Sequence, residues 1–336
     1  MRFRASCALA SVWMLSCGTL ATEAGDTGAE RPNALAGPFR LLGKDEIDAP
    51  GAPYVLDKQF WRFRQPTVLA DEPGVVLGAT HLYAVATDTG VSGLFRFVAP
   101  DGRTFSPKPD PAAPVIALED ADAPEVARVG DAIWLFYSTP AGIFLARSSD
   151  GAAFDLPTAP VLGPGGGGWE GGKPPRAPAH VQIAPDDHRL LYEVNGRIGE
   201  AQSSDGAAWT RVGDGPLLEP GDDVDGEPAF DGSEVGDPEV VQARSPEGRW
   251  VTRVYYTGRA ADGSTGIGLA ARFGDEGPLE RATSPAFTGP RGPRAPAVVP
   301  QGAFTLLFLE QRAGTKEDWP AIAAGIAPAT RRIPVD

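Results

Sequence analysis

The fold is decided by "DAPEVARVGDAIWLFYSTPAGIFLARSSDGAAF", residues Asp122–Phe154. The stretch contains the short runs "PEVARV", "AIWLFYS" and "IFLARSS", which are separated by turn residues at Gly130–Asp131 and Pro140–Gly142. Apolar and aromatic runs of this length, bounded by Gly and Pro, are typical of antiparallel β-strands. No segment of the chain keeps a helical apolar period over several turns. The stretch therefore predicts a meander of short strands.

The same unit occurs five times along the chain. Its first strand is marked by a proline motif that appears as "RQPTV", "DAPEV", "RAPAHV", "GDPEV" and "RAPAV", with prolines 58, 54, 60 and 58 positions apart. Strand units repeated at a fixed period and arranged radially form a β-propeller. We therefore expect an all-β protein, a five-bladed β-propeller with four-stranded antiparallel blades. The last unit lacks a clear outer strand, and "APYVLDKQFWRF" (52–63) is expected to close the ring as an N-terminal strand.

A second repeat, "ARSSDGAAF" (146–154) and "AQSSDGAAW" (201–209), falls at the end of the second and third units. Asp-Gly is a turn pair, because Gly accepts a positive φ angle at little cost. The repeat predicts a hairpin, with Phe154 and Trp209 beginning outer strands that pack between blades. It also resembles the Asp-box of sialidase propellers, although it lacks the residue expected between Asp and Gly, and that fold has six units rather than five.

The first residues are typical of an export signal. Arg2 and Arg4 precede an apolar run that is too short to span a bilayer, followed by "MLSCG". The latter resembles a bacterial lipobox with Cys17 as the lipidated residue, and cleavage after Ala24 is the alternative. We expect a signal peptide over 1–24, a linker over 25–50 and the propeller over 51–336. We therefore expect either an envelope lipoprotein, which is held at the membrane only by its lipid, or a secreted or periplasmic protein.

Composition excludes some partners and sites. The chain of 336 residues carries 30 basic and 44 acidic residues, a net charge of −14, so it repels nucleic acid. Both cysteines, Cys7 and Cys17, lie in the predicted signal peptide, which leaves no disulfide in the folded part. We expect a monomer that does not bind nucleic acid.

The motifs "DPEVV", "YYTG", "IGLAA" and "LFYS" together resemble the five-bladed glycosidase clan that includes the arabinanase and β-xylosidase group and the invertase and levansucrase group. The resemblance covers all five units. It implies a substrate pocket at the axial end of the propeller, which carboxylates reach from the inner strands. Glycosidic cleavage needs a proton donor for the leaving oxygen and a carboxylate that faces the anomeric carbon.

The resemblance implies catalytic roles for Asp122 and Asp237, which stand at the proline motifs of the second and fourth units. The first unit has Arg64 where the clan has its base Asp, and the third has Arg176 where it has its acid Glu. The standard catalytic trio is therefore incomplete. Candidate substitutes or substrate contacts follow the same inner strands or lie near them: Glu125, Glu239, His180, Asp71, Glu72 and Glu170.

The proline motifs place the arginines Arg64, Arg176 and Arg294 among the aspartates Asp122 and Asp237. This pattern has two interpretations. The residues form ion pairs that join the blades, or the arginines bind an anionic group such as a uronate carboxylate, since the guanidinium fork matches a planar carboxylate.

Three further features of the sequence could belong to a cofactor or metal site. "GGGGWEGGKPP" matches a phosphate-loop pattern formally, but Pro174 replaces the magnesium-binding Ser or Thr, so we expect a loop in which Trp169 stacks on a sugar or anchors the loop. The acidic stretch 219–239 resembles a calcium loop only faintly and favours a solvated loop. His81, His180 and His188 show no metal-ligand spacing. We expect no cofactor and no metal.

Two functions remain open from the sequence. The first is an exported glycosidase-like propeller that hydrolyses or binds glycans with axial carboxylates. The alternative is a non-catalytic carbohydrate-binding or scaffold propeller whose catalytic trio has decayed.

Overall fold

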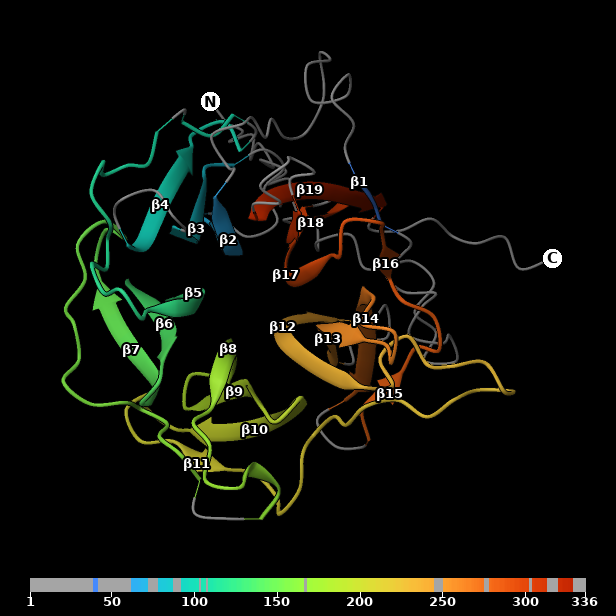
Figure 1. Cartoon of the computed structure of the whole chain (residues 1–336). Coiled ribbons are helices and arrows are strands. Elements are labelled where there is room, and N and C mark those ends of the chain that lie inside the picture. The colour runs from blue at the N-terminus through green and yellow to red at the C-terminus, as the bar shows by residue number, and fades with distance from the viewer. Residues whose placement is uncertain are drawn as a thin grey trace, which may run out of the picture.

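The computed structural model consists of five antiparallel sheets around a central axis (Figure 1). It describes residues 39–41, 62–71, 78–86, 92–102, 104–106, 108–165, 168–244, 250–274, 278–301, 304–312 and 320–328. The strands nearest the axis are β2, β5, β8, β12 and β17, and each of them contains one of the five proline motifs. The predicted five-bladed propeller is confirmed.

Blades 1 and 2 have three strands each. Blade 1 consists of β2 (Phe63–Ala70), β3 (Thr80–Ala86) and β4 (Gly93–Ala99). Blade 2 consists of β5 (Asp122–Val129), β6 (Ala132–Thr139) and β7 (Gly142–Ser148). Among the described residues that follow these strands, isolated bridges continue the sheets, as between Leu94 and Ile116. The segments that follow β4 and β7 are rich in proline, which cannot donate a ladder hydrogen bond, and this accounts for the lack of a fourth strand in their described parts.

Blades 3 and 4 have the fuller sheets. Blade 3 consists of β8 (Arg176–Ala184), β9 (Asp187–Val194), β10 (Arg197–Ser203) and β11 (Thr210–Arg211), preceded by the 3₁₀ turn η3 (Gly168–Glu170). Blade 4 consists of β12 (Glu234–Arg244), β13 (Trp250–Arg259), β14 (Thr265–Phe273), β15 (Glu280–Arg281) and β16 (Phe287–Thr288).

Blade 5 combines the two ends of the described chain. It consists of β17 (Arg294–Gln301), β18 (Phe304–Arg312), β19 (Pro320–Pro328) and β1 (Arg40–Leu41), which pairs with β19. The outer strand is N-terminal, as expected, but it comes from within the stretch predicted as linker rather than from residues 52–63. Of that segment only Arg62 and Phe63 are described, and Phe63 begins the inner strand of blade 1.

Five apolar clusters fill the spaces between neighbouring blades. Alternate residues of a strand enter different clusters: Tyr255 packs between blades 4 and 5, and Tyr256 between blades 3 and 4. Both faces of the sheets are therefore buried, which is why the strands read as almost continuous apolar runs. The blades are held together by side-chain packing and by contacts at the axis.

The "SSDGAA" repeats connect the third strand of a blade to the segment outside it. Asp150 Oδ1 accepts hydrogen bonds from Ala152 N and Ala153 N, and Asp205 Oδ1 accepts the equivalent pair. Phe154 packs in the cluster between blades 1 and 2, and Trp209 in the cluster between blades 2 and 3. The predicted turns and inter-blade aromatics are confirmed. An outer strand follows Trp209 as β11, but among the described residues only the isolated bridge between Arg147 and Asp155 follows Phe154. Five blades exclude the six-bladed sialidase fold.

The predicted signal peptide (1–24) with Cys17 lies outside the described residues, so export and lipidation stay predictions. Among the described residues, no helix has the length and apolar character that a membrane crossing requires.

Candidate functional site

The inner strands share an unusual backbone conformation at the proline motifs. The residue before each proline has a positive φ angle between 43° and 49°, although none of them is glycine: Gln65, Ala123, Ala177, Asp237 and Ala295. The strand pairing shifts register at the same places, so each motif is a β-bulge. A positive φ angle costs a residue with a Cβ atom about 1–2 kcal/mol. Five such bulges persist because the surrounding structure holds them.

A ring of inter-blade hydrogen bonds holds the bulges. At four of them the backbone N–H donates to a side chain on the second strand of the preceding blade. The acceptors are Glu310 for Gln65 (3.2 Å), Ser138 for Ala177 (2.9 Å), Glu193 for Asp237 (3.2 Å) and Thr257 for Ala295 (2.9 Å). Blade 1 has Val85 at this position, which cannot accept, and Gln65 Oε1 accepts from Ala123 N instead, at 3.2 Å.

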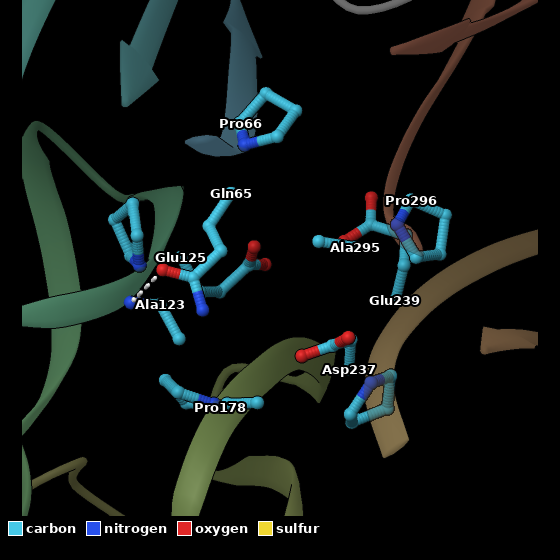
Figure 2. A pocket seen from close by; sticks show the side chains of 12 residues that line it. Gln65, Pro66, Ala123, Glu125, Pro178, Asp237, Glu239, Ala295 and Pro296 are labelled. Carbon is cyan, nitrogen blue, oxygen red and sulfur yellow. Dashed lines mark hydrogen bonds between the residues drawn. The ribbon is translucent and has the colours of Figure 1, made fainter. Parts of the chain in front are cut away.

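Side chains that include Gln65, Glu125 and Asp237 gather around the axis (Figure 2), and the space that they leave is small. The five bulges, together with Glu125 and Glu239, surround a hub cavity of about 30 Å³. A cavity of this size holds a water molecule and is too small for a sugar ring. Glu125 is fixed from both sides, because Oε2 accepts from Thr67 Oγ1 at 3.0 Å and Oε1 from His180 N at 3.4 Å. Glu239 Oε1 accepts from Val298 N at 3.1 Å.

Burial raises the pKa of both hub carboxyl groups. It raises the pKa of Glu125 to about 8, against the lowering effect of the Thr67 hydrogen bond, so Glu125 is mostly protonated at neutral pH. Burial, and then the charge of Glu125, raise the pKa of Glu239 well above its ordinary value. Both carboxyl groups therefore favour the protonated form more than exposed ones do. They stabilise the blades through hydrogen bonds and lie at a place that no sugar can enter.

A larger pocket opens beside the axis, between blades 3, 4 and 5. Its volume is about 340 Å³, within the range of small-ligand sites, and we call it the blade 3–5 pocket. It lies where β8, β12 and β17 begin, at the axial end expected to carry the site. The residues used below are Arg176, Glu193, Asp237, Thr257, Thr265 and Arg294.

Glu193 and Asp237 form the carboxyl pair of this pocket. Both approach Arg176 Nη2, Glu193 Oε2 at 3.6 Å and Asp237 Oδ1 at 3.8 Å. Burial and the neighbouring Asp237 raise the pKa of Glu193 to about 7, so this group holds a proton near neutral pH. Asp237 Oδ2 accepts a hydrogen bond from Thr257 Oγ1 at 3.0 Å. The pair offers one proton donor and one oxygen, Asp237 Oδ1, that is left for another partner.

Several polar atoms of the pocket have no hydrogen bond to any described residue. They are Asp237 Oδ1, Thr265 Oγ1 and Arg294 Nε, and all are buried. Buried polar atoms are almost always hydrogen-bonded, because an unmet donor or acceptor costs about 1–3 kcal/mol. Their position around one pocket indicates a polar ligand or ordered water there.

The remaining charged positions of the axis are paired. Arg64 Nη1 lies 2.5 Å from Asp122 Oδ1, and both side chains are about one-third exposed. Arg294 Nε lies 3.6 Å from Glu310 Oε1. The structure therefore brings four of the five predicted charged residues into contact across blades, Arg64 with Asp122 and Arg176 with Asp237, while Arg294 pairs with an acid of its own blade.

His180 and Trp169 lie away from the pocket lining. His180 is buried among aromatic rings between blades 2 and 3, and its Nε2 lies 3.1 Å from His188 Nδ1. The sequence had shown no metal-ligand spacing at these histidines, and it gave no indication of this contact. Burial and the neighbouring His188 lower the pKa of His180 to about 3. Trp169 stacks on Tyr192 with ring centres 6.3 Å apart, the arrangement of a loop anchor.

The other acidic candidates are held in structural contacts. Glu170 Oε1 accepts hydrogen bonds from Tyr192 Oη and Arg211 Nε, both at 2.7 Å. Asp231, in the acidic stretch, accepts from Tyr256 Oη at 2.7 Å and Arg281 Nη1 at 2.9 Å in the same way. These two matching contacts tie the loops before β8 and β12 to blades 3 and 4.

Asp71 lies at the far end of blade 1, 3.1 Å from His81 Nε2 and 3.0 Å from Arg128 Nη2, and Glu72 lies outside the described residues. Within the described part of the chain, no three potential metal ligands come together.

Sequence reasoning missed Glu193, the most perturbed carboxyl group of the pocket. A signal was present, because the run "LLYEV" (190–194) contains a single acid among apolar and aromatic residues. Aligning the second strands of the repeats would have put Glu193 level with Ser138, Thr257 and Glu310. The proline motif drew attention to the first strand alone.

Comparison with known proteins supports the architecture. No protein-family model matches the chain, and no curated protein matches it. Among solved structures, a thermostable family-43 glycoside hydrolase is similar at a TM-score of 0.58 and 18% identity, over 80% of this chain and 89% of that one. The α-L-arabinofuranosidase PaAbf62A from Podospora anserina is similar at 0.56 and 13%, over 89% and 99%.

A glycoside hydrolase described with the GH130 mannoside phosphorylases, which targets β-1,2 mannosidic linkages in Candida mannan, is similar at 0.61 and 14%, over 86% and 94%. At these identities the likeness concerns the fold, and it extends over nearly the whole length of the solved structures. The chain has the five-bladed propeller architecture that these glycoside hydrolases share.

Proposed function

We propose that the protein acts on glycans in the blade 3–5 pocket by hydrolysing a glycosidic bond. Glu193 donates the proton to the leaving oxygen, and Asp237 presents its carboxylate to the anomeric carbon. The observation that carries the proposal is the Glu193–Asp237 pair itself, in which burial and the neighbouring Asp237 raise the pKa of Glu193 to about 7. The propeller architecture, common among solved glycoside hydrolases, supports the same class of reaction.

The roles follow from how each group is held. Glu193 keeps 16% of its side chain exposed, so its carboxyl group reaches the pocket while most of it is shielded from water. Asp237 is oriented by Thr257, and the hydrogen bond from Asp237 N to Glu193 fixes the two groups relative to one another. Arg176 lies near both and stabilises negative charge that develops between them.

A screen of oligosaccharides for released reducing sugar tests this function. The panel contains arabino-, xylo-, fructo- and manno-oligosaccharides, assayed with the wild type and with Glu193→Gln and Asp237→Asn. Loss of the proton donor is expected to lower kcat by about 10²–10⁴-fold. Asp214→Asn, a change at an exposed turn after β11, serves as the matched control and keeps full activity.

Asp122, predicted to be catalytic, enters the same experiment as Asp122→Asn. Its ion pair with Arg64 leaves it outside the pocket lining, so a loss of less than about tenfold is expected. A loss as large as that of Asp237→Asn would return Asp122 to the catalytic set. Full activity of Glu193→Gln on a substrate that the wild type cleaves would refute the assigned roles.

The second candidate is a carbohydrate-binding propeller without catalysis. The near closure of the hub to about 30 Å³ and the ion pair of Arg64 with Asp122 favour it, because both remove groups that the clan uses at the axis. Calorimetric binding of a panel member, with no reducing sugar released over long incubation, would select this candidate.

A further inference from the structure

The arginines of the proline motifs differ in whether their guanidinium groups donate hydrogen bonds to the protein. Arg64 is hydrogen-bonded, because Nη1 donates to Gln65 Oε1 at 2.8 Å and to Asp122 Oδ1 at 2.5 Å. Arg176 and Arg294 donate no side-chain hydrogen bond to a described residue. Their nearest acidic oxygens lie at 3.6 Å or beyond, which is too far for a hydrogen bond.

Both of these arginines face the blade 3–5 pocket and are open to solvent on one side. The side chain of Arg176 is 47% exposed and that of Arg294 is 37% exposed, and both line the pocket. Arg294 Nε is buried and makes no hydrogen bond to a described residue, since Glu310 Oε1, its ion-pair partner, lies 3.6 Å away. Two cationic groups thus present several unused N–H donors to the same space of about 340 Å³.

The nearby acids do not neutralise these donors fully. Glu193 and Glu310 are 16% and 11% exposed, and burial raises the pKa of both, that of Glu193 to about 7, so Glu193 carries reduced negative charge near neutral pH. Asp237 is engaged through Oδ2 with Thr257. At the rim, Arg259 is occupied by Glu234 at 3.0 Å and does not compete for a ligand.

We propose that Arg176 and Arg294 bind the carboxylate of an acidic sugar, so that the glycan recognised in the blade 3–5 pocket contains a uronate residue. A guanidinium offers a planar fork of donors that matches a carboxylate, and such charge-assisted bonds are about twice as strong as neutral ones. The unmet hydroxyl of Thr265 and Asp237 Oδ1 are suited to the hydroxyl groups of the same sugar ring. The inference rests on the proposed function for the ligand class, and it adds the charge of the ligand.

The test compares acidic oligosaccharides with their methyl esters by isothermal titration calorimetry. Oligogalacturonides and oligoglucuronides are measured beside their fully methyl-esterified forms, which keep the sugar ring and remove the charge. We expect the wild type to bind at least one acidic form about tenfold or more tightly than its ester. The preference should fall as sodium chloride rises from 0.05 to about 0.5 M, because salt screens partly exposed charges.

Three variants test which arginine causes the preference for the acidic form over its ester. Arg176→Gln and Arg294→Gln are each expected to reduce it to within about twofold, while Arg176→Lys retains part of it. Arg128→Gln is the matched control, since this arginine pairs with Asp71 at the other end of the propeller and leaves the preference unchanged. Thermal denaturation of each variant reports its folding, and the comparison of acid with ester in the wild type needs no variant at all.

The outcomes separate this inference from the proposed function. Equal binding of acids and esters, or binding of no acidic oligosaccharide, overturns the inference, even where neutral glycans are cleaved. A preference that survives both glutamine substitutions also overturns it. Acid-selective binding without bond cleavage upholds the inference and refutes hydrolysis. A glucose 6-sulfate arm separates carboxylate recognition from recognition of any anion, and tighter binding of the sulfate ester than of every uronate contradicts the assignment.

Discussion

The hub and the blade 3–5 pocket are built from the same repeated motifs, and they share Asp237, yet they differ in almost every chemical property. The hub is nearly closed at about 30 Å³, and Glu125 accepts two hydrogen bonds there. The pocket measures about 340 Å³ and retains buried atoms without partners. The repeat therefore builds the axis, and the departures from it in blades 3 to 5 create the site.

The departures are specific residues. The ring position of the second strand is Val85 in blade 1 and Ser138 in blade 2, both small and uncharged, but Glu193 in blade 3 and Glu310 in blade 5. An acid at this position fulfils the structural role of accepting a backbone N–H and also adds a titratable group beside the pocket. Glu193 therefore both accepts an inter-blade hydrogen bond and lines the pocket as a titratable group.

The largest expected effect is a change in the stability of the folded protein with pH, caused by Glu125 at the hub. The pKa of Glu125 is about 8 in the folded protein and about 4.5 when unfolded, so between these values the folded state holds more protons. Raising the pH from 4.5 to 8 should therefore remove roughly 3–5 kcal/mol of stability through this group. Urea denaturation of the wild type and Glu125→Gln across this range measures the difference.

Comparing the two proteins cancels the other titrating groups. His180 acts in the opposite direction, because its folded pKa of about 3 lies below its unfolded value, and its contribution is lost as the pH falls from 6.5 toward 3. Glu119→Gln, at an exposed site before β5, should follow the wild type. Parallel pH curves for the wild type and Glu125→Gln would show that the hub carboxyl group is charged and exposed.

In the pocket the corresponding effect appears in activity. Because Glu193 must be protonated to act as the acid, kcat/KM should fall about tenfold per pH unit above a pKa of about 7, or about 100-fold by pH 9. The charge of Asp237 contributes to this pKa, so any residual activity of Asp237→Asn should show the alkaline limb at lower pH. A pH–rate profile on a substrate from the screen measures both. An alkaline limb that does not move in Asp237→Asn would contradict the coupling of the pair.

A smaller effect distinguishes the ring positions of blades 2 and 4. Ser138→Ala removes the acceptor of Ala177 N–H and should cost about 1–2 kcal/mol of stability without changing kcat/KM. Thr257→Val removes the equivalent acceptor and also the hydrogen bond to Asp237, so it should lower both stability and activity. Chemical denaturation and steady-state kinetics on the two variants separate the roles. Equal activity loss in both would mean that the ring, and not the pocket, controls the reaction.

Much of the architecture could be predicted from the sequence because the decisive signals are local. Proline removes a ladder donor, and its regular recurrence at Pro66, Pro124, Pro178, Pro238 and Pro296 marked the five inner strands. The same motifs placed Asp237 and two arginines in one pocket. Blades 1 and 2 have three strands in the described residues, where four were expected. The proline-rich stretches after β4 and β7 have a turn composition that resembles an ordinary strand connection, so the sequence did not show this difference.

The rest depends on distances that no local pattern contains. Glu193 becomes part of the site only through its pairing opposite Arg176 and its contact with the next blade. His180 meets His188 through the register of β8 and β9, a contact that the spacing of eight residues does not indicate. The small size of the hub cavity depends on how residues from all five blades meet at the axis, which no single stretch of sequence determines.

The smallest expected effect tests why the bulges tolerate residues with a Cβ atom. Ala177 has φ 47°, and glycine there would relieve about 1–2 kcal/mol of backbone strain while losing a buried methyl group and adding unfolded-state entropy. These terms nearly cancel, so Ala177→Gly should lie within about 0.5 kcal/mol of the wild type. Ala179→Gly, two residues along β8, has no strain to relieve and should lose about 1–2 kcal/mol. Equal losses in the two variants would mean that the bulge is unstrained, and that hydrogen bonds such as that from Ala177 N to Ser138 are not needed to hold it.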